Sequence, residues 1–89
     1  MINIEKLSYI KEKQPLLYNE LVEVAGLILN YEFTPNGEYD LLSDENKRIF
    51  QKRRNRFFSV MFDNNIMSRN GNELLENLRI IMEQKQKAC

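Results

Sequence analysis

The sequence contains no histidine, no tryptophan and a single cysteine, Cys89. Without histidine the chain lacks the commonest metal ligand and proton shuttle, and it has no base for a Ser-His or Cys-His nucleophile. One cysteine excludes a disulfide within the chain and a zinc site held by several cysteines. The three glycines form no glycine-rich phosphate loop. We therefore expect a protein that is not an enzyme and that uses no metal and no cofactor.

Long apolar runs are also missing from the sequence. No stretch approaches the roughly 20 apolar residues that a membrane span requires, and residues 1–5 lack the basic and apolar regions of a signal peptide. A length of 89 residues predicts a single domain, 1–89. The hydrophobic fraction of 43% and the charged fraction of 29% are typical of a soluble globular protein, which we expect in the cytoplasm.

Four segments have the apolar spacing of helices, and they are 4–14, 16–32, 43–62 and 73–87. Pro15 marks the start of the second helix because proline suits a first helical turn. Ser43, followed by two acidic residues, marks the start of the third helix as an N-cap. The second helix is apolar over more than half of its circumference, which predicts a central position. The predicted fold is therefore all-α, a compact bundle of about four helices.

The segment 31–42 breaks the helical pattern. Residues 34–37, Thr-Pro-Asn-Gly, favour a turn, because proline presets its φ angle while asparagine and glycine accept positive φ. The flanking residues alternate partly, so a small β-hairpin is one interpretation. An isolated hairpin of this length is marginally stable, and an irregular loop is the slightly favoured alternative.

The charges are distributed unevenly along the chain although they balance overall. Residues 1–46 carry three lysines and nine acidic residues, whereas residues 47–56 carry six basic residues and no acidic one. The excess positive charge is thus confined to about three turns of the third helix. This segment is the most informative feature of the sequence.

On a helix, Arg48, Lys52 and Arg56 form one basic stripe, beside Asn55 and Ser59. The opposite, core-facing side is predicted to hold these five apolar residues: Ile49, Phe50, Phe57, Val60 and Met61. Arg53 falls within that apolar arc, where an unpaired charge costs several kcal/mol of desolvation. We therefore predict that Arg53 either extends outward or pairs with a carboxylate of the second helix, Glu20 or Glu23.

A second patch combines the rings of Phe58 and Phe62 with Arg54 and Lys47. Three interpretations of the whole helix remain open. It is a solvated basic face with the two rings packed beneath Tyr39, or a nucleic-acid site, or a protein–protein interface. Nucleic acid suits arginine, lysine and exposed rings, while interface cores are enriched in aromatic residues and arginine.

The favoured hypothesis is a small regulator or inhibitor that docks on a protein partner through the helix at 47–62. The partner has an acidic surface or is a second copy of the chain. A nucleic-acid-binding regulator, on RNA or DNA, is the alternative, and no membrane or small-molecule substrate is indicated. The predicted partner-binding residues are Lys47, Arg48, Lys52, Arg54, Arg56, Phe58 and Phe62.

Composition adds a hypothesis about origin. The chain contains eleven asparagines, eight isoleucines and seven lysines, which indicates an AT-rich coding sequence. Such sequences are frequent among small phage and plasmid genes. This composition favours an accessory factor that acts by binding a host complex.

Overall fold

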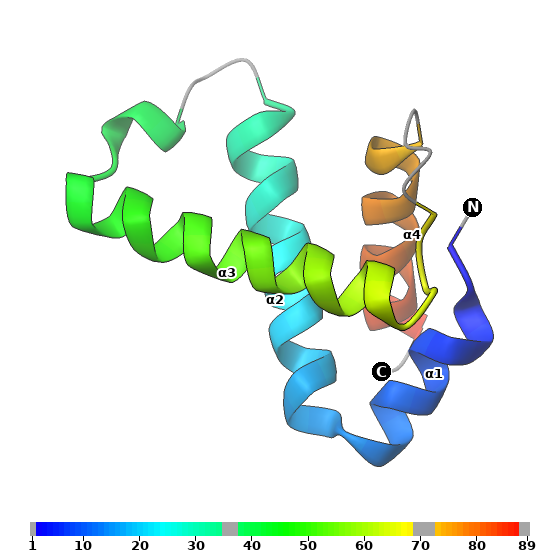
Figure 1. Cartoon of the computed structure of the whole chain (residues 1–89). Coiled ribbons are helices and arrows are strands. Elements are labelled where there is room, and N and C mark those ends of the chain that lie inside the picture. Colours follow the sequence, from blue (N-terminus) through cyan, green and yellow to red (C-terminus); the bar gives the residue numbers. More distant parts are fainter. Residues whose placement is uncertain (1, 35–37, 69–72, 88–89) are drawn as a thin grey trace.

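Residues 2–34, 38–68 and 73–87 are described by the structure, a computed structural model of the chain. Within these ranges the chain forms four α-helices and one 3₁₀ helix and no strand, as Figure 1 shows. The elements are α1 (Ile4–Lys13), α2 (Pro15–Glu32), η1 (Glu38–Leu41), α3 (Asp44–Asp63) and α4 (Leu74–Lys87). The predicted all-α bundle is confirmed.

Local capping explains where the helices begin. The side chain of Asn3 accepts a hydrogen bond from the backbone N–H of Lys6 at 3.1 Å, which caps α1. The Ser43 hydroxyl accepts from the N–H of Asn46 at 3.1 Å and caps α3 in the same way. Between α1 and α2 only Gln14 is non-helical, with φ −137°. This break follows from Pro15, because the residue before a proline avoids the helical conformation.

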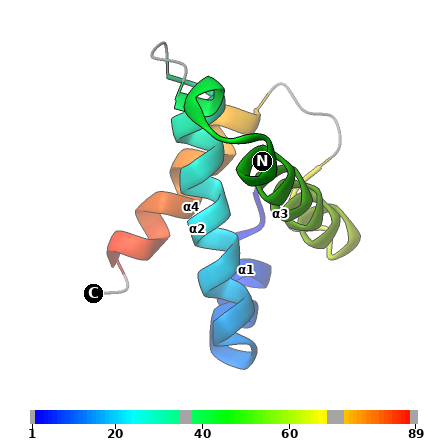
Figure 2. The ribbon, with the colours of Figure 1, turned by 90° about the vertical axis from the view of Figure 1, so that its left-hand side faces the viewer.

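Helix α2 lies at the centre of the molecule, as its broad apolar arc predicts. Helices α1, α3 and α4 and the η1 turn all pack against it, and Figures 1 and 2 show them arranged around it from different sides. Four α2 side chains with at most 1% exposure form the middle of the core: Leu21, Val24, Ala25 and Ile28. From α4, Leu78 and Ile81 meet this core with no exposed surface.

In the described part of the segment after α2, residues 38–41 form the 3₁₀ helix η1 and no residue forms a strand, so the hairpin interpretation is wrong there. Residues 35–37, which carry most of the predicted turn, lie outside the described residues. Instead of pairing as strands, the segment places Tyr39 against two aromatic rings. Its ring centroid lies 6.2 Å from that of Tyr31 and 5.9 Å from that of Phe50. Aromatic packing holds η1 on the bundle, together with side-chain hydrogen bonds that Asn30 donates to Glu38 and Gln51 donates to Tyr39.

Two sequence-based placements on α3 need correction. Ile49, predicted to face the core, is 47% exposed, because it lies about 100° around the helix from the buried Phe50. Tyr39 has its ring contacts with Tyr31 and Phe50. Phe58 contacts Phe57 and Phe62 instead. The Phe58 and Phe62 rings therefore do not pack beneath Tyr39, as one of the three interpretations of this helix proposed.

Candidate binding surface on helix α3

Helix α3 packs on the bundle through one narrow side. Of its twenty residues only Phe50, Phe57 and Met61 are buried. In Figure 1 the helix crosses α2 and continues beyond it, and in Figure 2 it lies to one side of α2. Most of the α3 circumference is consequently at the molecular surface, where it is available to a partner.

Arg53 is held by two carboxylates of α2, which confirms its predicted pairing. Its Nε and Nη2 atoms donate to Glu20 Oε2 and Oε1, both at 2.9 Å. Its Nη2 also lies 3.2 Å from Glu23 Oε2. The hydrogen bond from Arg53 lowers the pKa of Glu20, and the same bond raises the pKa of Arg53. Because the guanidinium and the Glu20 carboxylate meet through two hydrogen bonds, the pair fixes the orientation of α3 relative to α2 as well as the distance between them.

Arg54 makes a second ion pair with α2, and its partner is a carboxylate that the sequence did not predict. Its Nε donates to Glu32 Oε2 at 2.8 Å, and its Nη2 donates to Glu32 Oε1 at 3.0 Å. The guanidinium carbon also lies 4.8 Å from the centroid of the Phe58 ring. Arg54 is therefore engaged inside the molecule. The separation of the two residues in sequence gave no local signal for this pair.

The two predicted contact rings are half-buried and stacked on one another. The centroids of Phe58 and Phe62 are 5.6 Å apart with an angle of 22° between the ring planes. Phe58 also packs edge-on against the buried Phe57 at 5.1 Å. Lys47 lies 5.5 Å from the Tyr39 ring centroid. These predicted site residues thus have substantial contacts within the chain.

Arg48, Lys52 and Arg56 have a different environment. All three are exposed, and within the described part of the chain none has a hydrogen-bonded or ion-pair partner. Arg56 is nevertheless near enough to Glu20 of α2 for its charge to contribute, after the hydrogen bond from Arg53, to the lowered pKa of that carboxylate. Arg48 lies on the side of α3 opposite the buried Phe57, because the two residues are about two and a half helical turns apart and their side chains therefore point about 180° away from each other. We call the exposed polar face that these three residues form with Asn55 and Ser59 the outer face of α3.

The outer face has acidic residues at its two ends. Asp44 and Glu45 form the first turn of α3. At the other end, the Ser59 hydroxyl donates to Asp63 Oδ2 at 3.2 Å. The positive potential is therefore concentrated over the middle turns, from Arg48 to Arg56, a length of about 12 Å.

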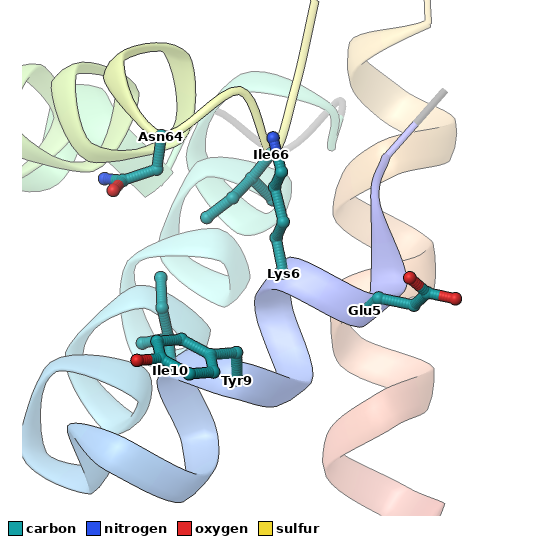
Figure 3. Close-up of a pocket in the computed structure, with 6 residues that line it drawn as sticks. All are labelled: Glu5, Lys6, Tyr9, Ile10, Asn64 and Ile66. Atoms are coloured by element: carbon teal, nitrogen blue, oxygen red, sulfur yellow. The ribbon is translucent and has the colours of Figure 1, made fainter.

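The structure also contains a hollow that the sequence analysis missed. It measures about 400 Å³ and is lined by Glu5, Lys6, Tyr9, Ile10, Asn64 and Ile66. In Figure 3, Lys6 extends toward Ile66, while Glu5 points away from the other lining residues. The residues that follow α3 meet α1 at this hollow. Asn65 turns the chain with a φ of 55°, and the Ile66 carbonyl accepts a hydrogen bond from the Asn3 N–H at 2.7 Å. No periodic pattern signals this contact.

The described residues show no sign of a metal site or of a membrane-spanning helix. They contain no cluster of three or more potential metal ligands. No helix among them is both long and apolar enough to cross a membrane. No protein family, curated protein or solved structure matches the chain.

Proposed function

We propose that this protein is a non-enzymatic regulator that binds nucleic acid through the outer face of α3. The observation that carries the proposal is the division among the basic residues of 47–56. Arg53 and Arg54 are paired with carboxylates of α2, whereas Arg48, Lys52 and Arg56 are exposed and aligned. Successive members of this stripe are about 6 Å apart along the helix, and such a row is suited to neutralising consecutive phosphates.

The acidic half of the sequence opposes this function less than its formal charge indicates. Three of its nine acidic residues, Glu20, Glu23 and Glu32, face the guanidinium groups of Arg53 and Arg54. The two guanidinium groups offset two of these three negative charges beside α3, where repulsion of phosphate would be strongest. Exposed charges farther away are screened beyond about 8–10 Å at ordinary salt concentrations.

The proposal favours the alternative of the sequence analysis over a protein partner, and the contacts of α3 are the reason. Docking on a protein was expected to use Phe58, Phe62 and Arg54 as the buried contact. Arg54 is bound to Glu32, and the two rings are half-buried against each other. The remaining outer face is polar, whereas interface cores are depleted in charged residues.

Fluorescence anisotropy with labelled DNA and RNA tests the proposal. With up to three phosphate contacts, we expect the affinity to fall by up to about 40-fold between about 50 and 200 mM salt. The variant Arg48→Glu/Lys52→Glu/Arg56→Glu should lose binding while keeping its helical circular dichroism. Lys6→Glu/Lys11→Glu/Lys13→Glu is the matched control, because it changes the net charge equally on α1. Equal loss in both variants, or no binding by the wild type, would contradict the proposal.

Docking on a protein remains a second candidate because one apolar side chain borders the stripe. Ile49 is 47% exposed and lies one turn or less from Lys52 along α3. Arginine beside exposed apolar surface is typical of protein interfaces. For a second copy as partner, sedimentation velocity should show a dimer that Ile49→Asp and the triple stripe variant both dissociate. A wild-type monomer at high concentration argues against self-association.

A further inference from the structure

We infer that the nucleic acid is duplex DNA and that the outer face of α3 lies in its major groove. This inference rests on the proposed function and adds the class of ligand. It follows from three properties of α3, namely the engagement of its aromatic rings, the chemistry of its outer face and the way α2 holds it.

The aromatic rings of α3 are poorly placed to stack on unpaired bases. Phe50 and Phe57 are buried. Phe58 has the Arg54 guanidinium over its ring and stacks on Phe62. Proteins that bind single strands use exposed rings along a basic groove as stacking platforms. Since the outer face itself has no aromatic residue, single-stranded DNA or RNA is the less suitable ligand.

The outer face has the side chains that read base edges. Arginine and lysine pair with guanine in the major groove, asparagine pairs with adenine, and serine pairs with either. Arg48, Lys52 and Asn55 place three of these four side-chain types on one exposed face, whereas the hydroxyl of Ser59, the fourth, donates to Asp63. The face extends over about 17 Å of helix. A sequence-reading role therefore needs no additional element of the chain.

The shape of the ligand is limited by the helix. An α-helix with its side chains is about 10–12 Å across, and the B-DNA major groove is about 12 Å wide. The major groove of an RNA duplex is too deep and narrow for side chains to read.

Helix α2 holds α3 firmly in the orientation that this contact requires. The buried side of α3 holds Phe50, Phe57 and Met61. Arg53 and Arg54 lie to the left and right of this side, and each makes two hydrogen bonds to one α2 carboxylate. Such forked pairs fix orientation because the planar guanidinium and carboxylate must align. The outer face is thereby directed away from α2, and little reorientation is needed on binding.

Competition among three probes tests the ligand class. The probes are a mixed-sequence DNA duplex of about 20 base pairs, one of its strands, and an RNA duplex of the same sequence. We expect the DNA duplex to bind at least about tenfold more tightly than either other probe. Equal or tighter binding of the strand or the RNA, lost in the triple stripe variant, would overturn this inference and leave the proposed function intact. No binding of any probe would overturn both.

A modified duplex tests the groove. Replacing guanine by 7-deazaguanine removes the N7 acceptor of the major groove but keeps base pairing and phosphate charge. We expect about tenfold weaker binding of the modified duplex, because arginine contacts guanine through N7 and O6. Unchanged affinity for the modified duplex would place the contact outside the major groove.

Discussion

The Arg53–Glu20 pair offers a quantitative test of how α3 is attached to α2. Glu20→Gln keeps the size of the side chain but replaces one acceptor oxygen by an amide that faces a donor. One of the two 2.9 Å hydrogen bonds is therefore lost. Hydrogen bonds to charged groups contribute about 1.5–3 kcal/mol when buried, whereas exposed ion pairs contribute about 0.2–1 kcal/mol. Side-chain exposures of 30% for Arg53 and 31% for Glu20 place this pair between the two.

We therefore expect Glu20→Gln to lower the free energy of unfolding by about 1–2 kcal/mol at neutral pH. Glu23 limits the loss, because it remains 3.2 Å from the Arg53 guanidinium. Urea unfolding followed by circular dichroism measures the difference. The matched control is Glu12→Gln, since Glu12 is 75% exposed and lies 4.0 Å from Lys13, and it should change stability by under about 0.5 kcal/mol.

The pH dependence of this difference has a definite sign. Hydrogen bonding from Arg53 lowers the pKa of Glu20 in the folded state. Its stabilising contribution is therefore present above the unfolded value of about 4.3 and is lost as the pH falls through the lower folded value. The wild type and Glu20→Gln should differ by a constant amount from about pH 6 to 7.5 and converge in acid. A difference that persists undiminished at about pH 2 would refute the ionic origin.

Three further substitutions test the packing and the helix ends. Phe57→Ala should cost roughly 3–5 kcal/mol, because the ring is 1% exposed, and a cost under about 1 kcal/mol in urea unfolding would contradict the placement of α3. Ser43→Ala should cost about 1 kcal/mol by removing the α3 cap, and unchanged thermal unfolding would refute this role. Gly26→Ala should stabilise α2 by about 0.5–1 kcal/mol, because an added Cβ would meet only the Met82 side chain, with Cε at 3.6 Å and Sδ at 3.7 Å; a lower melting temperature would show overpacking.

The helices could be predicted because their signals are local. Pro15 and Ser43 mark helix starts that the structure contains at Pro15 and Asp44, and the wide apolar arc of 16–32 gives the central position of α2. The η1 turn was not predictable from alternation, because the packing of Tyr39 on Phe50 depends on a contact between different elements. Ile49 was misplaced for a similar reason. A helical wheel gives angular neighbours but not the width of the side that the bundle covers.

The pairings at the candidate surface could be predicted where a signal local in the sequence required them, and could not be predicted where they depended on a contact between distant residues. The pairing of Arg53 was predictable, since an arginine within an apolar arc requires a carboxylate. The pairing of Arg54 with Glu32 was not, because Arg54 lies at the edge of that arc, where solvent is an equally good partner. The ion pairs of Arg53 and Arg54 with α2 distinguish the cations that hold the fold together from the three exposed cations of the stripe. Sequence alone showed six basic residues in 47–56, without indicating which of them the fold already uses.

The pairing of Arg53 and Arg54 with α2 predicts how strongly the binding affinity depends on salt, which a count of basic residues does not. If all six cations of 47–56 contacted phosphate, the affinity would fall with salt with a slope near −5. The three cations of the stripe give a slope no steeper than about −3, and a shallower one where a stripe side chain contacts a base edge instead of a phosphate. A slope no steeper than about −3 that disappears in the triple stripe variant would agree with Arg53 and Arg54 remaining on α2 in the complex. The steeper slope would require both arginine side chains to leave their carboxylates and reach phosphate.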